Sequence, residues 1–522
     1  TCAETTCGTF IGQHTLHHSP KIKMLLLHVC LVLLGIGSIH ANENCPATKY
    51  EGIQLRGHIM GFASSCATLE TCCAVAQRLG ASSLTYNTNS SNTPMDPSCR
   101  VFGQLEPAKS WDNCTSCTSF VTNATQPVPL PSTSPTTPVL LGPPNLPKFS
   151  WVPSSSDITD AQQHYSFGHA IGTEFSFIIQ DRMVSDVYLQ TKLIPFFHDS
   201  PTYDTFLAKN NATYPMYVLE LQGIADGSQV PFETLFINQM SEEFSYFYKP
   251  SVNEAFQHNP QRCSDLAWIS KEGRAYLVHN EDSGGGDMNH TALISAPQGV
   301  GSQGVPFTTY TYLGNTPTGA FGWNANDLLF TMNYVAPATG DLQGGLGRVF
   351  MARDLLTMAS IEDGIAKITR YGLVAGHNYQ LFDLKQQHMY NVEVANQGVF
   401  SIRQFQVGAP AYFHANTYQT LNIPQIGSNS STHRDARAKI MLAEHPITST
   451  NDMLNVIGDQ HDASWPIYHD NLSHEKGEKA DWTLCTLFVN PTLMELHIYT
   501  TNPIRNQPSD VIDLKTWFNT SK

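Results

Sequence analysis

The sequence predicts an α+β fold, with two sheets between helices, behind a small cysteine-rich module. Three observations support this prediction. Seven of the twelve cysteines fall in one N-terminal stretch, a proline-rich segment follows it, and strand-like apolar runs bracketed by helical periodicity fill the remainder. With 522 residues and 41% hydrophobic content, the chain is long enough for more than one domain and for a sizeable core.

The first part of the chain has the pattern of an exported protein. Residues 24–42 combine a short apolar run and a small-residue cleavage site near Ala41, and the basic residues Lys21 and Lys23 flank them, as in a signal peptide. The run is too short for a membrane span, and no later stretch approaches that length. Because Met24 stands where such a signal begins, residues 1–23 are expected to be an upstream segment foreign to the native protein. We expect a secreted or lumenal protein, extracellular or lysosomal.

Eight Asn-X-Ser/Thr sequons agree with export, although each triplet alone is weak evidence. The candidate glycosylation sites are Asn89, Asn113, Asn123, Asn211, Asn289, Asn429, Asn471 and Asn519.

Residues 43–125 are expected to form a disulfide-stapled module. The stretch Ala67–Ala76 contains a Cys-Cys pair and helical spacing, and with the surrounding cysteines it resembles a PAN/apple-like module. Such modules need disulfides because their cores are small. The segment is either a binding module for a protein or glycan ligand or a spacer, and the odd cysteine count leaves the connectivity open. The disulfide candidates are Cys45, Cys66, Cys72, Cys73, Cys99, Cys114 and Cys117.

Residues 126–148 predict a semi-rigid linker, because proline at this density blocks both helix and sheet. Residues 149–522 form the second domain, which contains only two cysteines, Cys263 and Cys485. Its first part reads as helical, and we expect a break in that helical region at residues 223–227, where two glycines occur.

After Cys263 the pattern changes from helical to strand-like. A hairpin turn is expected at residues 271–273, and a closing hairpin at residues 483–499. Other expected strands are residues 291–296, 308–313, 320–323 and 328–334, and expected helices are residues 347–370 and 434–445.

The charge balance narrows the function classes. The 29 basic and 44 acidic residues give a net charge of −15, which argues against a nucleic-acid partner. The 21 histidines show no zinc-site spacing, so neither a metal nor a cofactor is expected.

Several short motifs occur in a fixed order along the second domain. They are Phe167-Gly-His, Tyr214-Pro-Met-Tyr, Phe236-Ile-Asn-Gln, Cys263-Ser-Asp, His279-Asn-Glu-Asp, Met332-Asn-Tyr, His414-Ala-Asn and His433-Arg-Asp-Ala-Arg. In these motifs and their order the domain resembles the acyl-coenzyme A:6-aminopenicillanic-acid acyltransferase family of N-terminal-nucleophile (Ntn) hydrolases, which are peptidase C45-like and include β-alanyl-amine hydrolases.

This resemblance implies a fold and a maturation step. The fold is the Ntn-hydrolase four-layer αββα sandwich. Autoproteolysis of the Arg262–Cys263 bond would give an α-chain of residues 149–262 and a β-chain of residues 263–522, which remain together as a heterodimer.

The resemblance also assigns roles to five residues. Cys263 would be the nucleophile and, through its new α-amine, also the base. Asp282 would orient that amine, and Asn333 would donate to the oxyanion. Asn416 would lie near the nucleophile, and Arg434 beside the active site.

Each assignment has a structural alternative. Cys263 could instead form a disulfide with Cys485, because exported proteins favour pairing. Asp282 could merely cap the following turn. Asn333 could simply mark a strand end, and Arg434, expected at the start of a helix, could belong to a packed ion pair.

Two positions depart from the family pattern. His279 stands where relatives have arginine or glutamine, so its role is open. Arg262 stands where self-cleaving relatives commonly have glycine, whose freedom in φ and ψ eases backbone strain. Without cleavage the mechanism fails.

The preferred interpretation is therefore a hydrolase of linear amides that acts on a small-molecule substrate. Acyl transfer through the same thioester is a second possibility, and a non-catalytic secreted binding protein is a third.

Overall fold

The structure is a computed structural model of the chain. It describes residues 146–517, apart from 154–157, 248–262, 303, 343–344 and 476–480, and the backbone of five strands between residues 48 and 121. The expected upstream segment, the signal peptide, the sequon at Asn519 and Arg262 lie outside the described residues. The chain divides into two compact units, Thr1–Thr137 and Pro138–Lys522, and the division falls within residues 126–148.

The first unit contains one antiparallel sheet with the strand order β1-β5-β3-β4-β2. Its strands are β1 (Thr48–Gln54), β2 (Gly57–Ala63), β3 (Ser83–Asn87), β4 (Cys99–Leu105) and β5 (Asp112–Val121). The expected helix at Ala67–Ala76 lies outside the described residues, as do Cys45, Cys66, Asn89 and Asn123. The apple-like module and its disulfides stay predictions.

The second unit begins with a short strand and a run of helices. These elements are β6 (Lys148–Ser150), α4 (Asp160–Glu174), α5 (Ser176–Ser185), the π-helix η2 (Leu189–Leu193), α6 (Ile194–Phe197), α7 (Pro201–Thr213), α8 (Pro215–Ser228), α9 (Phe232–Gln239) and α10 (Ser241–Ser245). Among the described residues, no helix has the length and apolarity that a membrane crossing requires.

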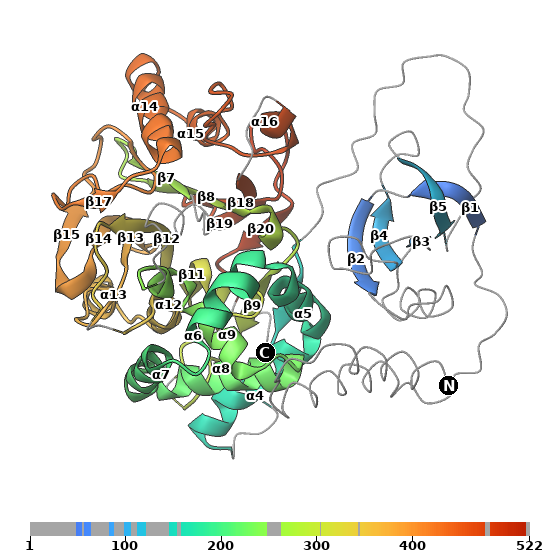
Figure 1. The fold of residues 1–522 in the computed structure, drawn as a ribbon. Coiled ribbons are helices and arrows are strands. Elements are labelled where there is room, and N and C mark those ends of the chain that lie inside the picture. The colour runs from blue at the N-terminus through green and yellow to red at the C-terminus, as the bar shows by residue number, and fades with distance from the viewer. Residues whose placement is uncertain are drawn as a thin grey trace, which may run out of the picture. The chain divides into compact units, whose positions relative to one another are not determined.

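Strands then build two sheets that run through the middle of this unit (Figure 1). The first, with the order β15-β14-β13-β12-β11-β10-β9-β6 and β17 beside β12, uses β6, β9 (Thr291–Ala296), β10 (Phe307–Tyr312), β11 (Gly319–Asn324), β12 (Leu328–Pro337), β13 (Gly376–Asp383), β14 (His388–Val394), β15 (Phe400–Gln404) and β17 (Gln425–Ile426). The second, with the order β16-β7-β8-β18-β19-β20, uses β7 (Ser264–Ile269), β8 (Ala275–Gly284), β16 (Tyr412–His414), β18 (Asp481–Asn490), β19 (Glu495–Tyr499) and β20 (Asp510–Asp513).

The remaining helices flank these sheets. They are η3 (Gly285–Asp287), α12 (Arg348–Leu355), α13 (Ile361–Ile368), η4 (Asn396–Gly398), α14 (Asn429–Glu444), α15 (Thr450–Ile457) and α16 (Asn471–Glu475).

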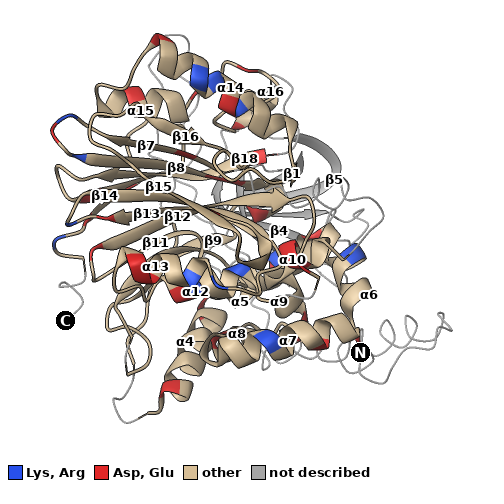
Figure 2. Ribbon diagram, turned by 90° about the vertical axis from the view of Figure 1, so that its left-hand side faces the viewer, with Lys and Arg blue, Asp and Glu red and all other residues tan. Residues whose placement is uncertain are grey.

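Three apolar clusters separate four layers. One cluster joins the first helices to the larger sheet, for example through Phe167 and Phe330. A second lies between the two sheets, and a third joins the smaller sheet to α14 and α15. Figure 2 shows both sheets between α4–α9 on one side and α14–α16 on the other. The expected α+β class with two sheets between helices is confirmed.

Alternation along β7 decides which side chains face which layer. Ala267 and Ile269 pack between the sheets, whereas Leu266 packs toward α14 and α15. In β8, Leu277 faces the layer between the sheets and Val278 the helical side. Because successive side chains point to opposite faces of a strand, odd-numbered residues of β7 and β8 share the inner layer.

Most expected elements occur, including the 271–273 turn and the 483–499 hairpin. The expected break at residues 223–227 is wrong, because α8 continues through both glycines. A Cβ on Gly223 would lie 2.2 Å from the Tyr165 carbonyl oxygen of α4, and one on Gly168 would lie 1.9 Å from that of Glu220. The glycines are there for close helix contact, not for chain reversal.

We therefore expect Gly223→Ala to lower the free energy of unfolding by about 1–3 kcal/mol, as overpacking does. Gly427→Ala is the control, because a Cβ there meets no atom within 4 Å. Urea unfolding of the two variants measures the difference, and equal losses would contradict the contact between α4 and α8.

Candidate active site

Cys263 lies directly before β7, and its thiol is buried. The residue is 2% exposed, and Sγ donates to Oε2 of Glu281 at 3.3 Å. Burial, and after it the negative charge of Glu281, raises the pKa of the thiol to about 12. The thiol is therefore protonated in the intact chain, and it requires a base before it can act as a nucleophile.

His279 lies between two carboxylates in the same layer. Its Nδ1 is 2.8 Å from Oδ1 of Asp265, and its Nε2 is 2.9 Å from Oε2 of Glu281. Burial alone would lower the pKa of His279, but the Asp265 carboxylate raises it well above its usual range. The Tyr312 hydroxyl donates to the other oxygen of Glu281. The thiol thus faces a buried and connected charged cluster.

The hairpin register brings these residues together. Asp265 pairs with His279 and Ser264 with Asn280, so the same register continued by one residue places Cys263 opposite Glu281. Asp265, Glu281 and Tyr312 were not predicted as site residues. The 271–273 turn combined with strict alternation is the sequence signal that could have identified Glu281, which stood unremarked inside the His279-Asn-Glu-Asp motif.

Asp282 projects to the opposite, helix-covered face of β8. Its Oδ1 accepts from Thr483 Oγ1 at 2.6 Å, and Nε2 of His469 is 3.7 Å from its Oδ2. Oδ2 has no hydrogen-bond partner among the described residues. Burial raises the pKa of Asp282 to about 7, against the opposing charges of His469 and Arg434. The turn-cap interpretation is wrong, since Asp282 lies within β8 and is bound to the neighbouring strand.

Arg434 binds the backbone of Cys263. The guanidinium is fully buried and donates to the Cys263 carbonyl at 2.9 Å and to Ser264 Oγ at 2.7 Å. It also donates to Asn416 Oδ1 at 2.8 Å. The expectation that Arg434 starts a helix is wrong, because Ser428 caps α14 and Arg434 lies in its second turn.

Asn416 links this arginine to the larger sheet. Its Nδ2 donates to the Tyr334 carbonyl in β12 at 2.9 Å, while its Oδ1 accepts from Arg434. The next residue toward the N-terminus in β12 is Asn333. Arg434 therefore binds Asn416, and Asn416 binds the backbone of the residue that follows Asn333, so the structure links these three predicted site residues.

Asn333 is fully buried inside β12, so a strand end does not explain it. Its Oδ1 accepts from Asn378 at 3.3 Å, and Asn378 in turn accepts from Asn391. Its Nδ2 has no hydrogen-bond partner among the described residues. Thr331, on the same face two residues earlier, donates to Asp265 at 2.8 Å. The amide donor of Asn333 therefore faces the layer that holds the thiol.

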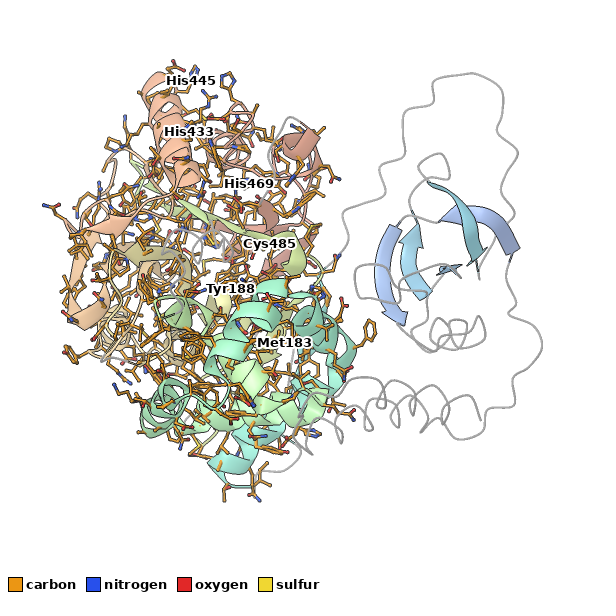
Figure 3. All side chains as sticks on the ribbon, viewed as in Figure 1. Met183, Tyr188, His433, His445, His469 and Cys485 are labelled. Atoms are coloured by element: carbon orange, nitrogen blue, oxygen red, sulfur yellow. The ribbon has the colours of Figure 1, made fainter. Side chains whose placement is uncertain are left out.

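The alternative disulfide between Cys263 and Cys485 is wrong, because both are free buried thiols. Figure 3 labels Cys485 in the body of the unit, with His469 above it.

A separate cavity of about 390 Å³ lies in the helical layer, lined by residues that include His164, Tyr214 and Arg353. It shares no lining residue with the cluster around Cys263, so it is not part of this site.

Comparison with known proteins adds to the geometry. Residues 268–505 match the family model "Acyl-coenzyme A:6-aminopenicillanic acid acyl-transferase", a range that includes Asp282, Asn333, Asn416 and Arg434. The beta-alanyl-dopamine/carcinine hydrolase of Drosophila melanogaster is 24% identical over 366 residues, covering 66% of this chain and 92% of that protein. The Caenorhabditis elegans N-acylethanolamine-hydrolyzing acid amidase ortholog aligns at 12% identity, over 42% of this chain and 100% of that chain, with a TM-score of 0.30, too low to establish a shared fold.

The raised pKa of Asp282 predicts a pH dependence of stability. Its pKa rises from 3.8 to about 7 in the folded chain, so the folded state holds this proton more tightly than the unfolded state. The unfolding free energy therefore falls as pH rises from about 4 to about 7, by a few kcal/mol. In a Cys263→Ala background, which keeps the chain intact, Asp282→Asn should flatten that fall.

Urea unfolding at several pH values measures this difference. Glu242 and Glu243, whose pKa values burial also raises to about 7, contribute equally to both proteins and cancel. Parallel stability curves would show that Asp282 ionises normally.

Proposed function

The chain belongs to the acyl-coenzyme A:6-aminopenicillanic acid acyltransferase family, and from this premise we propose that it is an Ntn cysteine amidohydrolase of small N-acyl amines. The Drosophila relative hydrolyses a β-alanyl amine, which supports β-alanyl conjugates as the substrate class. One observation carries the proposal. The Cys263 thiol and the amide donor of Asn333 face the same buried layer, and that donor has no partner among the described residues.

Maturation supplies the missing base. Sγ of Cys263 attacks the carbonyl carbon of Arg262, and the peptide nitrogen of Cys263 leaves as a free amine. Water then hydrolyses the resulting thioester, which releases the Arg262 carboxylate and restores the thiol. The new α-amine lies next to the thiol and can accept its proton.

Turnover repeats the same chemistry on the substrate. The α-amine takes the thiol proton, Sγ attacks the substrate carbonyl, and Asn333 Nδ2 donates to the oxyanion. The ammonium returns its proton to the leaving amine as the amide C–N bond breaks. Water activated by the α-amine then hydrolyses the thioester and releases the acid. An added amine that took the place of this water would give acyl transfer instead.

Three other residues hold the nucleophile in place. Arg434 fixes the Cys263 carbonyl, and Asn416 fixes Arg434 relative to β12. The oxygen of Asp282 that lacks a partner lies on the face of β8 that Arg434 also occupies. A new ammonium at Cys263 would supply a hydrogen bond to this oxygen and a positive charge in addition to those of His469 and Arg434.

The two fragments remain together after cleavage. Strand β6, from the part before Cys263, pairs with β9 in parallel, and helices α4–α10 share a core with the larger sheet. Extensive shared apolar burial of this kind holds cleaved chains together without a covalent link. The mature protein is thus a heterodimer of its own two chains.

Export to a secreted or lumenal compartment is part of the same proposal. The four sequon asparagines whose side chains the structure describes are all exposed, which glycosylation requires: Asn211, Asn289, Asn429 and Asn471.

N-terminal sequencing of the secreted protein should find a fragment beginning at Cys263. Cys263→Ala should yield only the uncut chain and no hydrolysis of a β-alanyl amine, since it lacks the thiol. Arg262→Gly is the matched control, because it removes a trypsin-like cleavage site but keeps the thiol, and it should still be cut. A cut in Cys263→Ala, or none in Arg262→Gly, would assign the cleavage to another protease. An uncut, inactive wild type would leave the binding-protein interpretation.

Asn333→Ala should lower kcat by about 10²–10³-fold with little change in KM, because it removes a donor used only in the transition state. Asn324→Ala is the control, since Asn324 is another buried asparagine of this sheet whose amide donates to the Leu356 and Met358 carbonyls. Steady-state kinetics on the cleaved proteins compares the two. Equal losses of kcat in the two variants would show that Asn333 contributes only to packing and not to the oxyanion.

A further inference from the structure

Three potential metal-ligand atoms meet at the nucleophile. Sγ of Cys263, a ring nitrogen of His279 and a carboxylate oxygen of Glu281 lie within 4.8 Å of one another, and all three residues are buried. Glu281 Oε2 is 3.3 Å from Sγ and 2.9 Å from Nε2 of His279. Thiolate, imidazole and carboxylate are the side-chain groups that bind zinc.

We propose that Cys263, His279 and Glu281 form a Zn²⁺ site, and that zinc bound there reversibly blocks the nucleophile. Zinc at its usual bond lengths, about 2.0–2.3 Å, sets tetrahedral ligand atoms about 3.3–3.8 Å apart. The Sγ–Oε2 distance of 3.3 Å already lies at that spacing, the Nε2–Oε2 distance of 2.9 Å is shorter than it by less than an ångström, and all three ligand atoms lie within 4.8 Å of one another. Three protein ligands leave a fourth position for water.

The surrounding groups are those that support a metal-bound histidine and carboxylate. His279 directs Nδ1 at Asp265, which leaves Nε2 for the metal in the arrangement that orients zinc-bound imidazoles. Tyr312 donates to the oxygen of Glu281 that does not face the thiol. Asp265 is itself held by Thr331 at 2.8 Å. These contacts order both ligands before any metal arrives.

Charge balance also favours the exchange of protons for zinc. Zinc binding replaces the proton on Sγ and the proton on Nε2, and both protons go to solvent. Two protons leave and one divalent cation enters, so the net charge of the buried cluster does not change. A buried site therefore takes up the metal without the cost of adding an unpaired charge.

The bound metal would hold sulfur as a zinc thiolate, whose negative charge the metal withdraws, so the sulfur becomes a much weaker nucleophile toward a carbonyl. Inhibition in this sense rests on the proposed function, but zinc binding does not. The two parts are measured separately for this reason.

The test uses the purified full-length chain after treatment with a chelator. When Zn²⁺ is then added and the excess is removed by gel filtration, wild type should retain one zinc per chain, as measured by elemental analysis. With Co²⁺ as the probe it should show a thiolate-to-cobalt charge-transfer band and the visible bands of tetrahedral cobalt. His279→Gln and Glu281→Gln should lose both signals, and Asp265→Asn should bind zinc about 10- to 100-fold more weakly. His198→Gln, which alters an exposed His198–Glu233 pair, should bind as wild type does.

Two results would overturn the proposal. One is a wild-type chain whose cobalt spectrum lacks the sulfur band, a measurement that needs no variant to fold. The other is equal zinc retention in His279→Gln and wild type. If zinc binds but the chain hydrolyses no amide, the proposed function fails and the zinc site stands. If the chain hydrolyses amides, Zn²⁺ should inhibit wild type and a chelator should restore its activity. A variant that has lost the zinc site but remains active should not be inhibited by Zn²⁺.

Discussion

The buried guanidinium of Arg434 is the interaction on which the rest of the site depends. It joins three separate parts of the chain: the start of β7, the segment after β16, and α14. A guanidinium without these acceptors would be an uncompensated charge in the interior, so the three parts must be placed correctly together. The Cys263 carbonyl is one of those acceptors. The position of Cys263, the proposed nucleophile, is therefore fixed by the requirement to satisfy a buried cation.

The layer between the sheets combines an apolar part with a polar one. Ala267, Ile269 and Leu277 belong to its apolar cluster, whereas Cys263, Asp265, His279 and Glu281 continue the same strand faces as a charged cluster. Burying such groups costs free energy unless each has partners, and here Thr331, Gln380 and Tyr312 from the opposite sheet supply them. The opposite sheet thus also fixes the orientation of the cluster beside Cys263, because the donors that bind the cluster belong to that sheet.

Features of the fold and the site that depend on local interactions could be predicted from the sequence, whereas features that depend on tertiary contacts could not. Alternation and the 271–273 turn are local, and they correctly predicted the β7–β8 hairpin. The glycines at 223 and 227 were read as a helix break because their reason is tertiary, namely contact with α4. Family resemblance named Asp282, Asn333, Asn416 and Arg434, and the structure links the last three. It did not single out Glu281 or Tyr312. The register of the β7–β8 hairpin could have identified Glu281, whereas Tyr312 comes from β10 of the other sheet, whose packing against β8 no local pattern reveals.

Cleavage before Cys263 would change the electrostatics of the site on both faces of the strand at once. In the intact chain the thiol pKa is about 12 and Asp282 has a pKa of about 7, because burial outweighs the opposing charge of His279 at the thiol and those of His469 and Arg434 at Asp282. A new α-ammonium at Cys263 would add a positive charge next to the thiol and, in the proposed role of Asp282, next to that carboxylate as well, and it would favour the ionised form of both groups. One broken peptide bond would then supply an amine that accepts the thiol proton when neutral and that pairs with the carboxylate when protonated. In the proposed mechanism, the unfavourable burial of these two groups is therefore the physical reason that the chain would need cleavage before it could act.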